Sequence, residues 1–313
     1  MKAEADDGAV AAIVVTYEPD RTALLATLSR TMEQVRRVLV VDNGSANRPS
    51  WEADAAALPG VELLPLEDNF GVATALNHGV RHLATSGDHQ WVLTLDQDTT
   101  LCDRAIETLF AAFGELDEAT RRRTGALGLS FPRPSPRAFW RWAERHLILG
   151  EVGAFRDRLF LITSGNLIRR SVAESVPYED DLFIDQVDTA FSVAVRAAGY
   201  VLLELAEPQM RHEVGTVVEV RGKRYRYETG NRLYYIVRNA TLLMRRRQLP
   251  LAVSVALLAS WCRAYLYVNG PAALPRELAI IGTAVFDALS GRLGRRQYRF
   301  LAEPRGRRAK LTG

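Results

Sequence analysis

Short apolar runs alternate with helix-like segments through the first third of the chain. Each run ends in polar residues, and the segments between the runs have the length of ordinary helices. Strands that alternate with helices predict an α/β fold, a mostly parallel sheet flanked by helices, with ligands bound beyond the carboxyl ends of the strands. The expected strands are Ala11–Tyr17, Val35–Ser45, Val61–Leu66 and Gln90–Leu95, and the expected helices are Arg21–Glu33, Trp51–Leu58 and Gly71–Ala84.

The later part of the chain changes from a mixed pattern to a helical one. Two more helices, two more strands and one strand with a turn are expected before residue 230, and three helices after it. The pattern therefore predicts a main domain over residues 1–229 and a C-terminal helical extension with a basic tail over residues 230–313. The expected elements are a helix at Asp103–Leu116, strands at Ala126–Phe131 and "YVLLEL", a strand and turn within Leu159–Arg170, a helix with Ile184, Val187, Phe191, Val195 and Ala198 on one face, and helices at Asn231–Arg247, Leu251–Val268 and Leu274–Leu289.

The composition is that of an ordinary folded protein, because 48% of the 313 residues are hydrophobic and 25% are charged. The only two cysteines, Cys102 and Cys262, provide neither a disulfide framework nor the spacing of a zinc site. The first ten residues, "MKAEADDGAV", are acidic and lack the apolar core of a signal peptide. A cytoplasmic location is therefore expected. Peripheral attachment at the inner face of the membrane is a further option within that location.

The net charge of +3 hides a strong asymmetry. Residues 221–313 contain 19 Lys and Arg against 4 Asp and Glu, whereas the preceding residues contain 21 against 33. A basic region of this kind fits either an anionic partner or a solvated surface, and charge alone favours the surface. The apolar stretch from Leu249 to Val268 is interrupted by Arg263 and is too short for a confident membrane span. Packing on the main domain is expected, with an interfacial helix beside Arg245–Arg247 as the alternative.

The stretch "WVLTLDQDTTL" ends an apolar run in two carboxylates, Asp96 and Asp98, one residue apart. Two carboxylates at the end of a buried strand repel each other and lose hydration, and a divalent cation removes both penalties. Oxygen ligands of this kind suit Mg²⁺ or Mn²⁺. The alternative is that one aspartate caps the helix expected from Asp103 while the other is solvated.

Two further strand ends carry polar groups that suit a nucleotide. Asp42 in "VVDNGS" can accept the imide N–H of a pyrimidine, although Asp-Asn-Gly-Ser is also strong turn chemistry and both roles are compatible. Asn69, Gly71 and Asn77 surround a helix start, where backbone N–H groups bind phosphate and the amides bind base or ribose. An ordinary helix cap explains them equally well.

The segment "LFIDQVDTAF" places Asp185 and Asp188 on one side of a helix start. Asp185 fits a capping role, whereas Asp188 lies one turn further in, beside the apolar face. A general base that takes the proton of an attacking hydroxyl is a reason for a carboxylate there. His212 follows strand-like sequence, and from the sequence pattern alone it is a structural or solvated histidine.

Together these motifs resemble an inverting glycosyltransferase of family 2 with the GT-A fold, in its rhamnosyltransferase-like branch. The matching motifs run in the expected order over about residues 11 to 240, which is roughly three quarters of the chain. Each motif is modest alone, and the ordered set is specific. The motifs are "VVTYEPD", "VVDNGS", "DNFGVATALNHG", "LTLDQDT", "ITSGNLI", "LFIDQVDTAF", "RHEVG" and "RLYYIVRN".

The resemblance implies a role for each matching residue. Asp98 would ligate Mg²⁺ or Mn²⁺, Asp96 would lie near ribose and metal, His212 would complete the metal site, and Asp188 would be the catalytic base. The nucleotide pocket would be lined by Thr16, Tyr17, Asp42, Asn69, Gly71 and Asn77. The diphosphate or the acceptor would meet Ser164, Gly165, Asp185, Arg232, Tyr234, Tyr235 and Arg238.

The reaction implied by the resemblance is transfer of a single sugar with inversion. The donor would be dTDP-L-rhamnose, and the acceptor a lipid-linked saccharide or a small metabolite. The partners expected beyond these are a membrane surface met through the basic C-terminal region and a second copy in a homodimer, with no nucleic acid. The chain departs from the family where an acidic residue and an arginine usually follow the base, because Ala190 and Ala194 occupy those positions. Arg196 stands two residues later, and this departure affects acceptor recognition more than the base. The Q-x-x-R-W signature of processive synthases is absent from the sequence.

Two other functions remain alternatives at this stage. A haloacid-dehalogenase-like phosphatase would use Asp96 as its nucleophile with Asp98 beside it, but the acidic pair Asp180-Asp181 precedes Lys223, the reverse of the order which that class needs. A non-catalytic nucleotide-sugar-binding protein would not need Asp98, Asp188 and His212 together. A third function, that of a dinucleotide-dependent dehydrogenase, has less support than these two, because no G-x-G-x-x-G follows the first strand.

Overall fold

The computed structural model describes residues 10–85, 89–132, 146–212, 216–220, 223–227, 232–248 and 251–298. Contacts within the chain separate two compact units. The N-terminal unit consists of Met1–Glu179 and Val187–His212, and the C-terminal unit consists of Asp180–Gln186 and Glu213–Gly313. The sequence pattern predicts a boundary between residues 229 and 230. The contacts instead divide the chain after His212 and assign the short segment 180–186 to the C-terminal unit.

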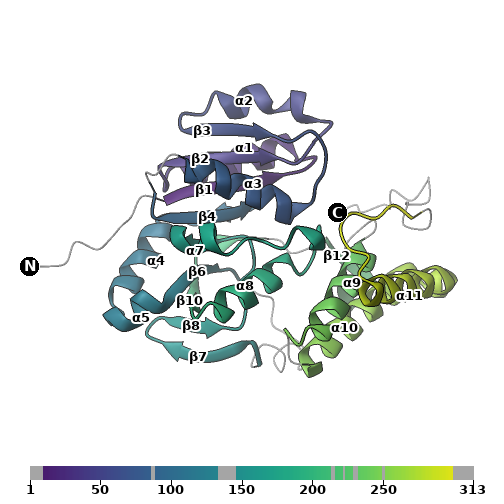
Figure 1. Ribbon diagram of the computed structural model, residues 1–313. Helices are drawn as coiled ribbons and strands as arrows, with labels where there is room; N and C mark the ends of the chain where they lie inside the picture. The colour runs from purple at the N-terminus through teal and green to yellow at the C-terminus, as the bar shows by residue number, and fades with distance from the viewer. Residues whose placement is uncertain are drawn as a thin grey trace, which may run out of the picture. The chain divides into compact units, whose positions relative to one another are not determined.

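The N-terminal unit is built on a nine-stranded sheet in the order β3-β2-β1-β4-β9-β6-β10-β8-β7 (Figure 1). Seven strands run in one direction, and only β9 and β8 oppose them, so the expected mostly parallel sheet is confirmed. The strands are β1 (Val10–Thr16), β2 (Arg37–Asp42), β3 (Val61–Pro65), β4 (Trp91–Asp96), β6 (Thr124–Ser130), β7 (Ile148–Val152), β8 (Phe155–Arg158), β9 (Asn166–Arg169) and β10 (Val201–Pro208). Strands β5 (Thr100–Leu101) and β11 (Met210–Arg211) form a separate short ribbon.

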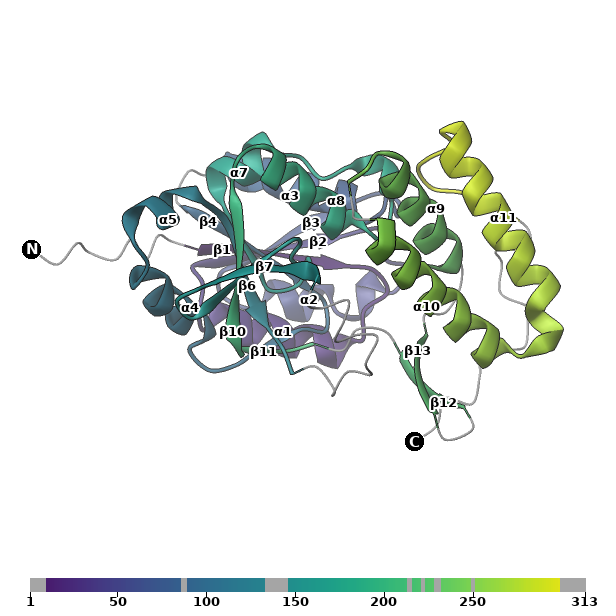
Figure 2. The same ribbon diagram turned by 90° about the horizontal axis from the view of Figure 1, so that it is seen from below.

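Helices cover both faces of this sheet, which explains why its central strands are apolar throughout rather than alternating. Figure 2 shows α3, α7 and α8 on one face and α1 and α4 on the other. The first helix begins where the Asp20 carboxylate accepts the Ala23 N–H at 2.9 Å, an ordinary N-cap. The helices are α1 (Arg21–Met32), α2 (Glu52–Ala56), α3 (Val72–Ala84), α4 (Ala105–Gly114), α5 (Glu118–Arg123), α7 (Arg170–Ser175) and α8 (Val187–Ala197), with a 3₁₀ turn η1 (Arg48–Ser50).

The far edge of the sheet differs from the sequence-based expectation. Strands β7 and β8 were not predicted, and of the expected strand within Leu159–Arg170 only β9 forms. The β8 sequence, "FRDR", has one apolar residue, so its pattern does not indicate a strand. It is held by pairing with β10, and the buried Arg158 side chain faces Glu204 of β10 at 3.6 Å.

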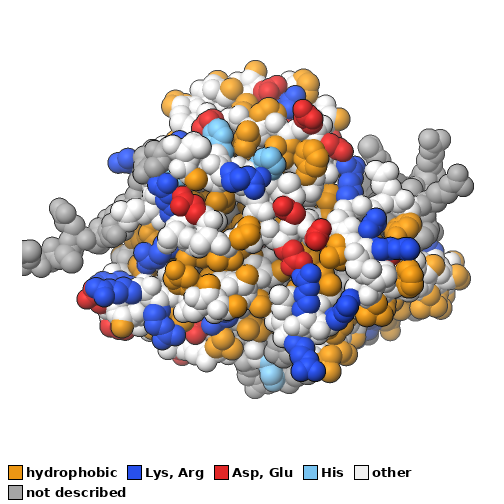
Figure 3. Space-filling model, viewed as in Figure 1, with side chains coloured by type: hydrophobic (Ala, Val, Ile, Leu, Met, Phe, Trp, Pro, Cys, Tyr) orange, Lys and Arg blue, Asp and Glu red, His pale blue; other side chains and the backbone are white. Residues whose placement is uncertain are grey.

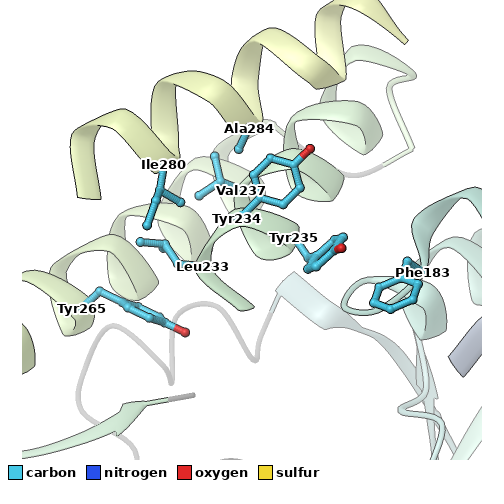
Figure 4. Close-up of a cluster of buried hydrophobic side chains, with 8 residues drawn as sticks. All are labelled: Phe183, Leu233, Tyr234, Tyr235, Val237, Tyr265, Ile280 and Ala284. Carbon is cyan, nitrogen blue, oxygen red and sulfur yellow. The ribbon is translucent and has the colours of Figure 1, made fainter. Parts of the chain in front are cut away.

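The C-terminal unit is a helical bundle with a β-hairpin. Helix α11 packs on α9 through a buried cluster that includes Leu233, Val237, Ile280 and Ala284 (Figure 4). Of the helices in the part of the chain that the structure describes, none has the length and apolarity needed to cross a membrane. The elements are η2 (Asp180–Leu182), β12 (Thr216–Val220), β13 (Lys223–Tyr227), α9 (Arg232–Arg245), α10 (Leu251–Asn269), η3 (Pro271–Ala273) and α11 (Leu274–Ser290).

Two fully buried polar side chains of α9 organise the segment 180–186. The Asn239 amide donates to the carbonyls of Leu182, Ile184 and Asp185 at 2.8–3.0 Å. The Arg238 guanidinium donates to the carbonyls of Asp181, Leu182 and Gly294. This support matters because Phe183, Asp185 and Gln186 all have positive φ, a strained conformation for residues with a side chain. Burial lowers the pKa of Arg238.

Replacing Arg238 with Met is expected to lower the free energy of unfolding by about 3 kcal/mol, because the carbonyls of Asp181, Leu182 and Gly294 each lose a hydrogen bond from a charged donor. Chemical denaturation checks this value. The matched control is Arg246→Met, just beyond the same helix at an exposed position, which should change the stability by less than about 0.5 kcal/mol. Equal effects of the two substitutions would contradict a supporting role for Arg238.

Candidate functional site

Three predicted site residues end three adjacent strands. Thr16, Asp42 and Asp96 are the last residues of β1, β2 and β4, which run parallel. Thr16 pairs in register with Asp42, and Val15 pairs with Asp96, so the three ends lie side by side at the carboxyl edge of the sheet. This edge is where ligands bind in open α/β sheets.

The Asp42 carboxylate is held by hydroxyl and amide donors. Oδ1 accepts from the Thr16 hydroxyl at 3.2 Å and from the Ser45 hydroxyl at 2.5 Å, and Oδ2 accepts from the Ser45 N–H at 3.3 Å. The Arg48 guanidinium lies 3.7 Å from Oδ2. The turn expected at Asp-Asn-Gly-Ser is therefore present. It holds the buried Asp42 carboxylate at the end of β2.

A pair of interlocked amides joins the end of β2 to the start of α3. The Asn43 amide donates to Asn69 Oδ1 at 3.0 Å, and Asn43 Oδ1 accepts the Phe70 N–H at 3.0 Å. Asn69 Oδ1 also accepts the Gly71 N–H at 3.0 Å. Gly44 permits this approach, because a Cβ there would lie 2.5 Å from the Asp68 carbonyl carbon and its φ is +77°. Asn69 and Gly71 are thus positioned beside Asp42.

The two aspartates after β4 sit in a tight turn. The Thr99 N–H donates to the Asp96 carbonyl at 3.2 Å, and the Gln97 side chain accepts the Tyr17 N–H at 2.8 Å. Gln97 is thus tied to the end of β1, while ligand atoms of Asp96, Asp98 and His212 all lie within 4.8 Å of one another. His212 Nε2 is 3.7 Å from Asp96 Oδ2. Two carboxylates and an imidazole in such proximity form a donor set that fits Mn²⁺ or Mg²⁺.

A chain of hydroxyl groups supports this cluster from within the protein. The Thr99 hydroxyl lies 2.9 Å from His212 Nδ1 and 2.6 Å from the Ser164 hydroxyl, and Ser164 accepts the Asp96 N–H at 3.0 Å. If Nδ1 carries the proton and donates to Thr99, Nε2 keeps its lone pair for a metal. Ser164 was predicted to meet diphosphate or acceptor. In the structure its buried hydroxyl makes hydrogen bonds with the Asp96 N–H and the Thr99 hydroxyl.

Gly165 is also a packing residue in this structure. Its N–H donates to the Thr94 carbonyl at 2.9 Å, and its carbonyl accepts from the Leu129 N–H at 2.8 Å. Its φ is +77°, and a Cβ would lie 2.5 Å from Met210 Sδ. Glycine therefore allows the chain to cross between β4 and β6, directly before β9 begins.

Asn77 and Asp188 belong to a second group of residues around Tyr178. The Asn77 amide donates to the Tyr178 carbonyl at 2.8 Å, and its oxygen accepts the Tyr178 N–H at 2.9 Å, so the predicted nucleotide-binding residue ties α3 to this segment. Asp188 is half-buried in the first turn of α8, where Oδ1 accepts the Thr189 N–H at 2.7 Å. Burial raises the pKa of Tyr178, and the negative charge of Asp188 raises it further, which places the two side chains within electrostatic reach.

The remaining predicted residues lie in the C-terminal unit and contact one another rather than open space. Asp185 accepts two hydrogen bonds from Arg232, at 2.8 and 2.7 Å. Tyr234, Tyr235 and Arg238 are fully buried, with the Arg238 guanidinium 4.9 Å from the Tyr235 ring centroid. The structure packs these three side chains in a core, and their expected contact with diphosphate or acceptor stays a prediction.

The structure adds residues that sequence reasoning did not select. Gln97, Thr99 and Ser45 hold the two aspartate-bearing turns through contacts that span up to 113 positions in sequence. Their only sequence signal was adjacency to a selected aspartate. Tyr17, which was selected, is 46% exposed at the end of β1.

Comparison with known proteins gives one relative that matches most of the chain and another that matches about a third of it. The dTDP-rhamnosyl transferase RfbF of Shigella flexneri is 28% identical over 252 residues, which cover 78% of this chain and 82% of that protein. The N-acetylglucosaminyl-diphospho-decaprenol L-rhamnosyltransferase of Mycobacterium tuberculosis is 34% identical over 126 residues, 37% of this chain and 39% of that protein.

Solved structures resemble the fold at low sequence identity. S. aureus TarS, residues 1–349, matches with a TM-score of 0.52 and 13% identity over 91% of this chain and 82% of its own. The mannosyltransferase PcManGT from Pyrobaculum calidifontis, solved in complex with GDP-Man and Mn²⁺, matches with a TM-score of 0.50 and 21% identity over 90% of this chain and 78% of its own. These likenesses show the GT-A fold.

The family assignment rests on a match to a family model. The family model for Glycosyl transferase family 2 matches residues 11–176, which is more than half of the chain and includes the strand ends at Thr16, Asp42 and Asp96. The chain therefore belongs to glycosyl transferase family 2, and the protein is a glycosyltransferase.

Proposed function

We propose that this glycosyltransferase moves L-rhamnose from dTDP-L-rhamnose to a hydroxyl of a saccharide acceptor, with inversion at the anomeric carbon and with a divalent cation. The observation that carries the proposal is the Asp96, Asp98 and His212 cluster at the carboxyl edge of the sheet, beside the turn of Asp42. The names of the two rhamnosyltransferase relatives supply the sugar. Membership of the family displaces the phosphatase and the non-catalytic alternatives.

The donor site is assigned to the strand ends. Asp42 would accept the thymine imide N–H. The hydroxyls of Thr16 and Ser45 hold its carboxylate in a fixed orientation for this contact. Asn69 and Gly71 lie next along the same edge, where they would border ribose or phosphate. The exposed Tyr17 and the Asp96 carboxylate would border the sugar-bearing end of the nucleotide.

The metal site is assigned to Asp98, Asp96 and His212, with Mn²⁺ or Mg²⁺ as the ion. When bound, the ion would stabilise the negative charge of the departing nucleoside diphosphate. Asp96 and Asp98 would supply oxygen ligands from a turn that is closed by the hydrogen bond from the Thr99 N–H to the Asp96 carbonyl. The Thr99 hydroxyl would orient His212 through Nδ1. The repulsion between the carboxylates is the reason that these residues bind a cation.

The catalytic base is assigned to Asp188. Its position in the first turn of α8 leaves it half-buried, and the hydrogen bond from the Thr189 N–H orients its carboxylate. It would remove the proton of the acceptor hydroxyl as that oxygen attacks the anomeric carbon. A single base without a covalent intermediate yields inversion. The acceptor is a saccharide, lipid-linked or free, or a small metabolite.

The direct test supplies dTDP-L-rhamnose and rival nucleotide sugars with Mn²⁺ or Mg²⁺ and measures nucleoside diphosphate release. Release from dTDP-L-rhamnose that EDTA abolishes is expected, and NMR of the product should show the inverted anomeric configuration. Turnover of another nucleotide sugar with none from dTDP-L-rhamnose would contradict the proposed donor.

Asp98→Ala is expected to abolish the Mn²⁺-dependent part of dTDP binding, because the cluster loses its most exposed carboxylate. Calorimetry with and without Mn²⁺ measures this effect. The matched control is Asp103→Ala, an exposed aspartate nearby that pairs with Arg30, and it should bind as the wild type does. Unchanged metal-dependent binding in Asp98→Ala would exclude it as a ligand.

Thr99→Val should weaken Mn²⁺ binding by about 10- to 100-fold, because His212 loses the hydroxyl that orients its ring. Titration of the free protein with Mn²⁺, followed by electron paramagnetic resonance, reports this without a turnover assay. Thr100→Val, at the next position on β5, is the control and should leave the affinity unchanged. If both variants bind Mn²⁺ like the wild type, Thr99 does not position His212.

Asp188→Asn should lower kcat/KM for transfer by about 10²- to 10⁴-fold while leaving dTDP affinity close to that of the wild type. The amide preserves the shape of the side chain and removes the base. Asp54→Asn, which affects only a surface ion pair with Arg21, serves as the control. Full transfer activity in Asp188→Asn would assign the base to another residue.

A further inference from the structure

The outward face of α11 is apolar along its whole length. Leu278, Phe286 and Leu289 are 56%, 55% and 57% exposed, which is unusual for large apolar side chains. Figure 3 shows hydrophobic side chains gathered over this helix. None of its exposed residues carries a charge. They are Leu274, Pro275, Leu278, Ala279, Gly282, Phe286, Leu289 and Ser290, which we call the α11 face.

Both acidic residues of α11 point to the inside of the C-terminal unit. Glu277 and Asp287 are at most 1% exposed, and Asp287 accepts hydrogen bonds from the hydroxyls of Tyr234 at 2.5 Å and Tyr298 at 2.7 Å. Helix α10 contains no acidic residue. A soluble helix usually has the opposite arrangement, with its charges outside. Neither helix therefore presents a carboxylate at the surface.

Arginines gather at the C-terminal end of the α11 face. Arg245 donates to the carbonyls of Ala288 and Leu289, at 3.3 and 2.9 Å, and so closes the end of the helix. The Arg292 guanidinium lies 5.3 Å from the Phe286 ring centroid. Arg246, Arg247 and Arg295 have exposed side chains in the same region.

We propose that the α11 face docks on the surface of an anionic lipid bilayer. The helix would lie along the interface with Leu278, Phe286 and Leu289 at the boundary of headgroups and acyl chains. The neighbouring arginines would meet lipid phosphates, so the apolar and the electrostatic contributions act on the same side of the unit. The proposal goes beyond the proposed function, because it names a surface in the C-terminal unit and not a step in the transfer.

A second copy of the chain fits the α11 face less well. In a symmetric dimer the same patch from each copy meets the other, so arginine-bordered faces would be brought together. Because α10 and α11 expose no carboxylate, these arginines would have no acidic partner on either helix of the other copy. Anionic headgroups supply that partner.

The test is flotation of the full-length protein with vesicles of phosphatidylcholine that contain about one third phosphatidylglycerol, against vesicles of phosphatidylcholine alone. At about 0.1 M salt the protein should float with the anionic vesicles only, and at about 1 M salt, where charges are screened within about 3 Å, binding should fall. The double variant Leu278→Gln with Phe286→Gln should bind at least about ten-fold more weakly.

Control variants distinguish binding through the α11 face from nonspecific binding through other exposed apolar or basic side chains. Leu149→Gln removes a leucine that is 53% exposed on β7 and should float like the wild type. Arg246→Gln with Arg247→Gln should weaken binding, whereas Arg123→Gln, at an exposed position of α5, should not. Calorimetric dTDP binding by each variant shows that the catalytic unit is folded and separates this test from that of the proposed function.

Three outcomes would overturn the proposal. The first is that the wild type does not float with anionic vesicles. The second is that the double variant floats as well as the wild type, which would assign binding to another basic segment. The third is a dimer in sedimentation that the double variant abolishes, with no vesicle binding, which would assign the α11 face to a second copy.

Discussion

Mutual repulsion between carboxylates at the end of a parallel sheet is the constraint on which this structure depends. Strands β1, β2 and β4 end side by side, so Asp42 and Asp96 arrive at one edge and Asp98 follows within the same turn. The protein holds these groups mainly with neutral donors: the hydroxyls of Thr16 and Ser45 on Asp42, and backbone amides in the turns. Neutral donors orient a carboxylate without cancelling its charge, so this edge of the sheet keeps a negative potential.

The supporting contacts come from distant parts of the chain. Ser164, two residues before β9, contacts Asp96 and Thr99, and Thr99 contacts His212, directly after β11. A hydrogen bond between Asn43 and Asn69 joins the loop after β2 to the loop before α3. Asn77 makes two hydrogen bonds with the backbone of Tyr178. These hydrogen bonds join loops that are far apart in the sequence and thereby position the residues of the site.

The C-terminal unit uses buried polar groups in a different way. Arg238 and Asn239 bind backbone carbonyls of the segment 180–186 and thereby stabilise three residues with positive φ. Its helix α11 buries Glu277 and Asp287 and exposes Leu278 and Phe286, an inversion of the usual pattern. Such an inversion lowers solubility unless the face has a partner, and a bilayer surface would also bring the enzyme close to any lipid-linked acceptor.

The sequence by itself determined the fold class, the parallel strands β1 to β4 and the strand-end positions of Thr16, Asp42 and Asp96, because long apolar runs with polar ends depend only on local patterning. It did not predict β7 and β8, since an edge strand such as "FRDR" is stabilised by its pairing with β10 and not by its own composition. Only the tertiary structure decided that Thr99 and Ser164 support His212, that Asp185 binds Arg232, and that Tyr234, Tyr235 and Arg238 are buried. Motif spacing shows which residues are near one another along the chain, but whether a polar side chain faces a cleft or a carbonyl depends on contacts between segments that the chain brings together only when it folds.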